Sequence, residues 1–242
     1  QKTAYEIYQC DWSSDVCSSD LQRKTVGLKY MLFTWLPVNL PRPPDKFITQ
    51  ALDIAAKIPD DVIENVALNQ DDPEYYTRRI VKNGVEMNSR VQYGFDLGEE
   101  WHSWVKTNII ENYDSTGGRL SYGKDTSVHG AHVDSIFSDT YTYKLYYLLD
   151  SGGPDTKTNF YQEYGHPILR RGSREHICCC NDYSKLTLID QLQIPQKQWV
   201  LLNTNVLHDV ENITGLRINL VVMFSTNDIT KTLINFYKKF DK

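Results

Sequence analysis

Residues 216–224 have the sequence LRINLVVMF, a run of mostly branched apolar side chains that contains a single cation, Arg217. Branched and aromatic residues are typical of β-strands, because they pack well on a pleated surface. Similar runs occur earlier in the chain, separated by turn-forming residues such as Gly152, Gly153 and Pro154. They cover residues 119–122, 143–149, 186–194 and 199–202. The chain from residue 119 onward is therefore predicted to be a block of many strands.

Helical patterns lie on both sides of this block. Asp45 is predicted to be a helix N-cap, and apolar residues recur at helical spacing from there to Ile58. A second helix is predicted over 98–112 and a short amphipathic one over 228–242. Helices followed by many strands favour a mainly β fold with flanking helices. The two-residue periodicity favours a double-stranded β-helix, the cupin-like jelly roll, with its core at about 119–224.

The first 21 residues have a different character from the rest of the chain. Residues 11–21 (DWSSDVCSSDL) back-translate without a break to a string that resembles a common short-read sequencing adapter. Residues 1–6 (QKTAYE) match the other constant arm of that adapter. We therefore predict that Gln1 to Leu21 are an artefact outside the fold, and that one domain covers 31–242, with Met31 as a plausible start.

Charge, cysteine content and hydropathy restrict the class of protein. Without residues 1–21, which carry one Lys against four Asp and Glu, the formal charge of the chain changes from −5 to −2. This charge does not favour a nucleic-acid partner. The adjacent Cys178, Cys179 and Cys180 lack the spacing of a disulfide framework or a zinc site. No apolar run approaches eighteen residues, so we expect a cytoplasmic protein without a membrane partner.

The triplet His132-Val133-Asp134 is the first candidate for metal chemistry. In an extended chain His132 and Asp134 point to the same face, because side chains alternate along a strand. His208 follows the predicted strand 199–202 and supplies a second imidazole. Two His and one carboxylate on one side of iron(II) leave three coordination positions open for other ligands. The alternative is that these are ordinary polar residues, since such a triplet is common by chance.

Arg217 strengthens the hypothesis, because it is a lone cation in an apolar strand nine residues after His208. Burying an unpaired guanidinium is costly, and its planar fork matches a carboxylate. A carboxylate-bearing cosubstrate would supply the partner. The alternative is an arginine at a surface edge, paired with an aspartate.

Four segments together resemble the 2-oxoglutarate/iron(II) dioxygenases of the prolyl-hydroxylase type, over about 119–224. They are Tyr122-Gly123, ten residues before His132; the HVD triplet itself; LYYL at 145–148, followed by GG at 152–153 and TNF at 158–160; and the spacing from His208 to Arg217. This resemblance implies that His132, Asp134 and His208 bind iron(II). It also implies that Arg217 and Tyr147 bind the distal carboxylate of 2-oxoglutarate, and that Tyr122 binds nearer its keto-acid end.

The resemblance further implies dioxygen as a substrate, with ascorbate as an optional requirement. For Tyr122 and Tyr147 the alternative is core packing with a satisfied hydroxyl. The family commonly has tyrosine where this chain has His129, for which an ordinary polar role is favoured. The segments 135–141 and 161–183 do not match the family closely, and such loops set substrate choice.

The expected activity is hydroxylation of a C–H bond, with a prolyl residue of a peptide or protein as the first candidate. A small-molecule substrate such as a free amino acid, or a nucleobase, is less favoured. One alternative is a cupin-like metal-binding module without oxygenase activity. Another is a structural protein with a degenerate site. Arg217 separates these alternatives from an oxygenase, because simple metal binding does not need it.

Overall fold

The computed structural model describes part of the chain. The described residues are 33–57, 80–82, 85–87, 91–122, 131–134, 141–163, 170–171, 177–180 and 183–240. The elements belong to the unit Thr34–Lys242. The expectations for Gln1 to Leu21, Met31 and His129 concern residues outside the described ones.

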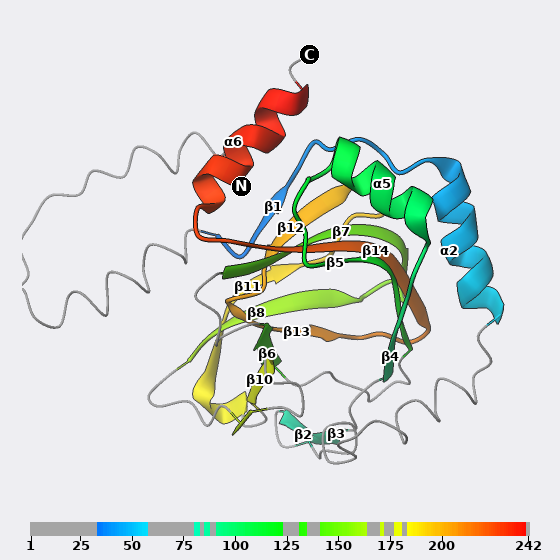
Figure 1. Cartoon of the computed structure of the whole chain (residues 1–242). Coiled ribbons are helices and arrows are strands. Elements are labelled where there is room, and N and C mark those ends of the chain that lie inside the picture. The colour runs from blue at the N-terminus through cyan, green and yellow to red at the C-terminus, as the bar shows by residue number, and fades with distance from the viewer. Residues whose placement is uncertain are drawn as a thin grey trace, which may run out of the picture. The chain divides into compact units, whose positions relative to one another are not determined.

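Two six-stranded antiparallel sheets form the fold, and they lie as separate layers in Figure 1. In order, the first sheet contains β1 (Trp35–Pro37), β12 (Trp199–Asn203), β7 (Tyr141–Ser151), β14 (Leu216–Thr226), β5 (Ser115–Tyr122) and β4 (Val91–Phe95). The second contains β11 (Leu186–Leu192), β8 (Lys157–Glu163), β13 (Leu207–Glu211), β6 (Ala131–Asp134), β10 (Ile177–Cys180) and β9 (Arg170–Arg171). A separate pair consists of β2 (Ile80–Lys82) and β3 (Val85–Met87). The predicted mainly β jelly roll with flanking helices is confirmed, and each of the five predicted strand runs lies on a strand.

The helices also lie where the sequence predicts them: α2 (Asp45–Lys57), α5 (Glu99–Asn108) and α6 (Ile229–Phe240). One detail is wrong, because the Pro44 carbonyl accepts the first helical hydrogen bond from the amide of Phe47. Asp45 is therefore the first helical residue and not the cap. No helix among the described residues combines the length and apolar character that crossing a bilayer requires.

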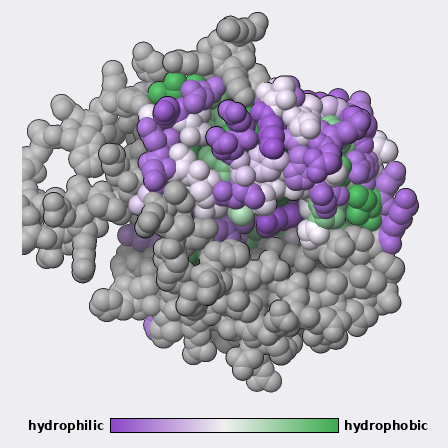
Figure 2. Space-filling model, viewed as in Figure 1, coloured by the Kyte–Doolittle hydropathy of each residue, from purple (hydrophilic) through white to green (hydrophobic). Residues whose placement is uncertain are grey.

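Helices α2 and α5 cover the outer face of the first sheet (Figure 1). Ala55 of α2 packs with Leu120 of β5 and Ile218 of β14. Trp101 of α5 is fully buried, and its indole nitrogen donates a hydrogen bond to the Thr116 hydroxyl at 2.9 Å. The described part of the surface in Figure 2 is mostly hydrophilic, with small separate hydrophobic areas. The first sheet is thus buried on both faces, by helices outside and by the second sheet inside.

The layer between the two sheets has an apolar part. Leu148, Val200 and Leu202 come from the first sheet and pack in one cluster with Phe160 and Leu192 of the second. Burying such side chains stabilises a fold by about 1.5–3 kcal/mol each. The polar residues of the same layer are the candidate site.

Candidate functional site

The three predicted iron ligands come from two neighbouring strands of the second sheet. His132 on β6 is the register partner of His208 on β13, and their ring centroids are 4.4 Å apart. Asp134 lies two residues after His132 on the same strand. All three residues are 5–6% exposed. The sheet therefore brings together side chains that are 76 residues apart in sequence.

His208 is held in the form that binds metals. Its Nδ1 lies 2.9 Å from the Val206 carbonyl oxygen, which can only accept, so Nδ1 carries the proton and donates. Nε2 then keeps its lone pair and lies 4.0 Å from Oδ2 of Asp134. Burial lowers the pKa of His208, which keeps the imidazole neutral. A neutral imidazole whose other nitrogen is fixed by a carbonyl is a typical metal ligand.

Asp134 is paired with a lysine that was not among the candidate site residues predicted from the sequence. Lys144 Nζ on β7 lies 2.5 Å from Asp134 Oδ2, and both side chains are 6% exposed. Burial alone would raise the pKa of Asp134, but Lys144 and then the two histidines hold it well below its usual range. With the side chains in these positions, no three His, Cys, Asp or Glu residues of the described part lie close enough together to hold an ion. Asp134 is ionised, and Lys144 supplies the counter-charge that a metal ion would otherwise supply.

A buried carboxylate lies beside His208 in the sequence. Asp209 is completely buried and accepts hydrogen bonds from the Asn159 amide at 2.9 Å, the Tyr161 hydroxyl at 3.1 Å and the Tyr183 hydroxyl at 2.5 Å. Burial, and then Asp209, raise the pKa of Tyr183 well above its ordinary value. Its hydroxyl therefore stays protonated as a donor.

Tyr183 also connects the two strands that carry the histidines. Its hydroxyl oxygen accepts a hydrogen bond from the backbone amide of Ala131 at 3.0 Å while it donates to Asp209. Ala131 precedes His132, and Asp209 follows His208. The Tyr183 hydroxyl thus connects the residue before His132 to the residue after His208, and it restricts the separation of β6 from β13.

Arg217 is the buried cation that the sequence predicts. It is 4% exposed, and burial lowers its pKa, with the nearby Tyr146 acting in the opposite direction. Its Nε has no hydrogen-bond partner among the described residues. Thr158 Oγ1 and Asn219 Oδ1 are likewise buried without a partner. The alternative of a surface arginine paired with aspartate does not hold, because Arg217 is buried and no acidic partner is found in the described part.

These orphaned polar atoms line the same cavity as the two histidines. Lys144 and Tyr146 also line it. Its volume is about 40 Å³, which is room for water but not for a five-carbon diacid. The chemistry of the walls fits 2-oxoglutarate, because a carboxylate would satisfy Arg217 and Thr158 at once.

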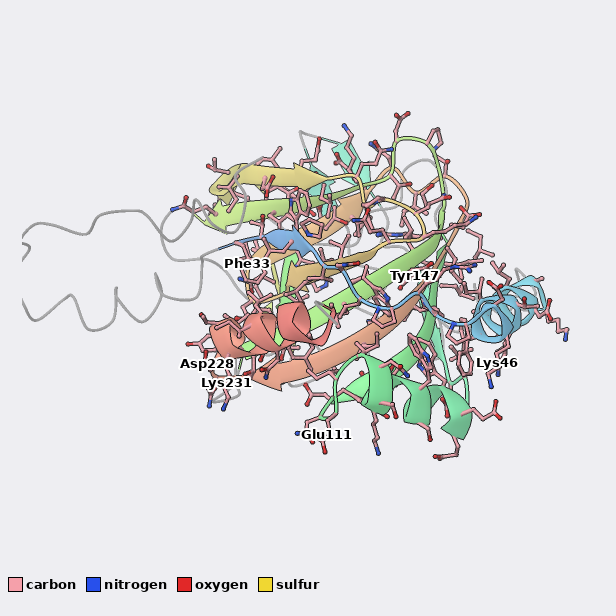
Figure 3. The ribbon with its side chains drawn as sticks, turned by 90° about the horizontal axis from the view of Figure 1, so that it is seen from above. Phe33, Lys46, Glu111, Tyr147, Asp228 and Lys231 are labelled. Carbon is pink, nitrogen blue, oxygen red and sulfur yellow. The ribbon has the colours of Figure 1, made fainter. Side chains whose placement is uncertain are left out.

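Tyr147, predicted to bind the same carboxylate as Arg217, does not line this cavity. Tyr147 on β7 is the register partner of Leu220 on β14, and its ring packs against Trp199 with the centroids 5.2 Å apart. It lines a different pocket of about 450 Å³, together with Arg42 and the segment between β1 and α2. Figure 3 shows Tyr147 beside that segment. The adjacent Tyr146 lines the site cavity instead. Side chains alternate along a strand, so a shift of one residue exchanges the two faces.

Tyr122 and the cysteines have defined backbone positions. Tyr122 ends β5 opposite Leu216, whereas Ser121 is opposite Arg217 and lines the cavity. The cysteine run forms part of β10 beside β6, with Cys179 opposite His132.

Lys144, Tyr146 and Arg119 line the site and were missed by the sequence argument. A usable pattern was present, because Lys144 is a lone cation in the aromatic strand YTYKLYYLL, as Arg217 is in its own strand. Lys144 and Tyr146 are two residues apart and must share a face.

No protein-family profile and no curated protein matches the sequence. Solved structures with a similar fold include AviO1 from Streptomyces viridochromogenes Tue57, with 13% identity and a TM-score of 0.40 over 80% of this chain and 90% of that one. A Pseudomonas putida prolyl-4-hydroxylase has 9% identity and a TM-score of 0.42 over 84% and 98%. The non-haem alpha-ketoglutarate-dependent carbocyclase SnoK from nogalamycin biosynthesis has 13% identity and a TM-score of 0.42 over 79% of both chains. The function proposed below rests on the site and not on these likenesses.

Proposed function

We propose that this protein is a non-haem iron(II), 2-oxoglutarate-dependent oxygenase that hydroxylates a C–H bond. One observation supports this most: two histidines from adjacent strands line a cavity with an arginine whose Nε has no partner among the described residues, and Asp134 lies two residues from one of these histidines. A prolyl residue of a peptide or protein is the first substrate to test. A cupin-like metal-binding module without oxygenase activity is the alternative, and it gives no reason for a buried Arg217.

Each side chain has a distinct part in the proposed activity. His132, Asp134 and His208 would hold iron(II), and Arg217 would hold the distal carboxylate of 2-oxoglutarate. Bound iron(II) would supply the oxidising chemistry, with 2-oxoglutarate and dioxygen as the co-reactants. The neutral His208 offers Nε2 without first losing a proton, and the ionised Asp134 supplies negative charge. The apolar cluster around Phe160 and Leu202 excludes water from the same layer.

Succinate release from 2-oxoglutarate by the whole chain, with and without iron(II), tests the proposal. We expect iron-dependent release that is lost in His208→Ala. Release that persists in His208→Ala would show that the metal lies elsewhere. A protein that binds Mn(II) but releases no succinate from 2-oxoglutarate when iron(II) is supplied would favour the metal-binding module.

Arg217 provides the second test. A hydrogen bond to a charged group contributes about 1.5–3 kcal/mol, so Arg217→Ala should weaken 2-oxoglutarate binding roughly ten- to a hundred-fold or more. Arg217→Lys should restore only part, because an ammonium lacks the planar fork. Arg42→Ala removes an exposed guanidinium outside the site cavity and is the matched control. Equal affinity in the wild type and Arg217→Ala would mean that the carboxylate binds elsewhere.

A further inference from the structure

A second arginine lies beside Arg217 on the wall of the cavity. Arg119 on β5 is the register partner of Asn219 on β14, and Ser121 is the register partner of Arg217. Arg119, Ser121, Asn219 and Arg217 all line the cavity, so they share the inner face of the first sheet. Diagonal neighbours on one face of two paired strands are about 7–8 Å apart. Arg119 and Arg217 therefore form a pair of adjacent like charges.

Among the described residues Arg119 has no ion-pair or hydrogen-bond partner for its side chain. It is half-buried. No carboxylate of the described part lines the cavity, and Asp134, two residues after the lining His132, is paired with Lys144. Two guanidinium groups at short distance in a partly buried cavity repel each other unless an anion lies between or beside them.

2-Oxoglutarate accounts for only one of these cations. Its distal carboxylate is assigned to Arg217, and its keto-acid end belongs with the metal. The cavity lining already has more cations than anions, and a divalent metal ion would add further positive charge. Arg119 is therefore left without an anion from the cosubstrate, and its planar fork suits a second carboxylate.

We propose that the substrate of this enzyme carries a carboxylate group, and that Arg119 binds it. The inference rests on the proposed oxygenase function and adds the chemical class of the substrate. It favours an amino acid, the C-terminus of a peptide or an acidic side chain over a neutral substrate.

A matched pair of small probes tests the inference. Propionate and propionamide have nearly the same shape, but only propionate carries a charge. Each would be added to the whole protein saturated with Mn(II) and with N-oxalylglycine, an unreactive analogue of 2-oxoglutarate. Paramagnetic broadening of the probe's proton signals reports its approach to Mn(II) and remains measurable for weak binding.

In the wild type we expect propionate to be broadened at least ten-fold more than propionamide. Arg119→Gln should reduce the propionate effect to that of propionamide, while Arg119→Lys should keep part of it. Arg42→Gln removes an exposed cation paired with Asp45 and should change nothing. The affinity of Arg119→Gln for 2-oxoglutarate should stay within about two-fold of the wild type.

Two results would overturn the inference and leave the proposed function intact. One is equal broadening by the two probes in the wild type. The other is an Arg119→Gln variant that loses affinity for 2-oxoglutarate but not for propionate, which would assign both arginines to the cosubstrate. A wild type that binds neither Mn(II) nor 2-oxoglutarate would instead refute the proposed function, and the inference with it.

Discussion

Replacing Lys144 with Met should destabilise the metal-free protein and strengthen metal binding. Lys144 Nζ lies 2.5 Å from Asp134 Oδ2, and both side chains are 6% exposed. Removing one partner of a buried ion pair costs roughly 3–5 kcal/mol, because the other charge remains buried without compensation. We therefore expect the free energy of unfolding of metal-free Lys144→Met to fall by about that amount.

The same pair opposes metal binding in the wild type, because an ion at Asp134 must displace the ammonium group. Without Lys144 the ion replaces a lost counter-charge, so the affinity for Mn(II) should rise, by on the order of a hundred-fold if about 3 kcal/mol is recovered. Urea unfolding with and without Mn(II) measures both effects. Lys106→Met, which removes an exposed lysine of α5, is the control. Metal-free Lys144→Met as stable as the wild type, or the same Mn(II) stabilisation in both, would refute the reasoning.

Three further predictions concern neighbouring side chains. Tyr183→Phe should weaken Mn(II) binding more than Tyr161→Phe does, because the Tyr183 hydroxyl also accepts a hydrogen bond from the strand that carries His132; equal effects in a Mn(II) titration would argue against this role of Tyr183. Tyr146→Phe should raise the 2-oxoglutarate Kd roughly two- to ten-fold, the effect of losing one neutral hydrogen bond, and Tyr147→Phe should not, since only Tyr146 lines the cavity. The melting temperature of the metal-free protein should fall as the pH drops below about 6.5. The pKa of His208 is lowered by folding, so the unfolded chain takes up that proton first and stability increases with pH through this window; a smaller pH slope in His208→Gln would support this, and an unchanged slope would contradict it.

The strands that the sequence predicts are those with long apolar or aromatic runs, such as β7 and β14. Strand β13, with the sequence LHDVE, has no such run, because its His208 faces a polar cavity and its Asp209 is satisfied by buried donors. Alternation of apolar and polar residues fails where the inside of a sandwich is itself polar. The spacing of histidines and carboxylate was informative there, since ligand chemistry does not depend on hydrophobicity.

The orientation of the two adjacent tyrosines could not be predicted for a related reason. Strand β7 is covered by helices on one side and by the second sheet on the other, so both of its faces are rich in apolar side chains. Two-residue periodicity then gives no preference for Tyr146 or Tyr147 as the residue that faces the cavity. Lys144 shows which face of β7 is the inner one, because a lone buried cation needs an anion and Asp134 lies on the inner side. Tyr146, two residues from Lys144, is on that same face.

The pairing between β6 and β13 determines how a bound metal ion would affect the stability of the second sheet. Within the described residues the only register pair that joins these strands is His132 with His208. An ion bound to both imidazoles would act as a crosslink between two strands that share a single register pair. Occupancy of the metal site would then be visible in the hydrogen-exchange rates of the backbone amides of 131–134, independently of any turnover.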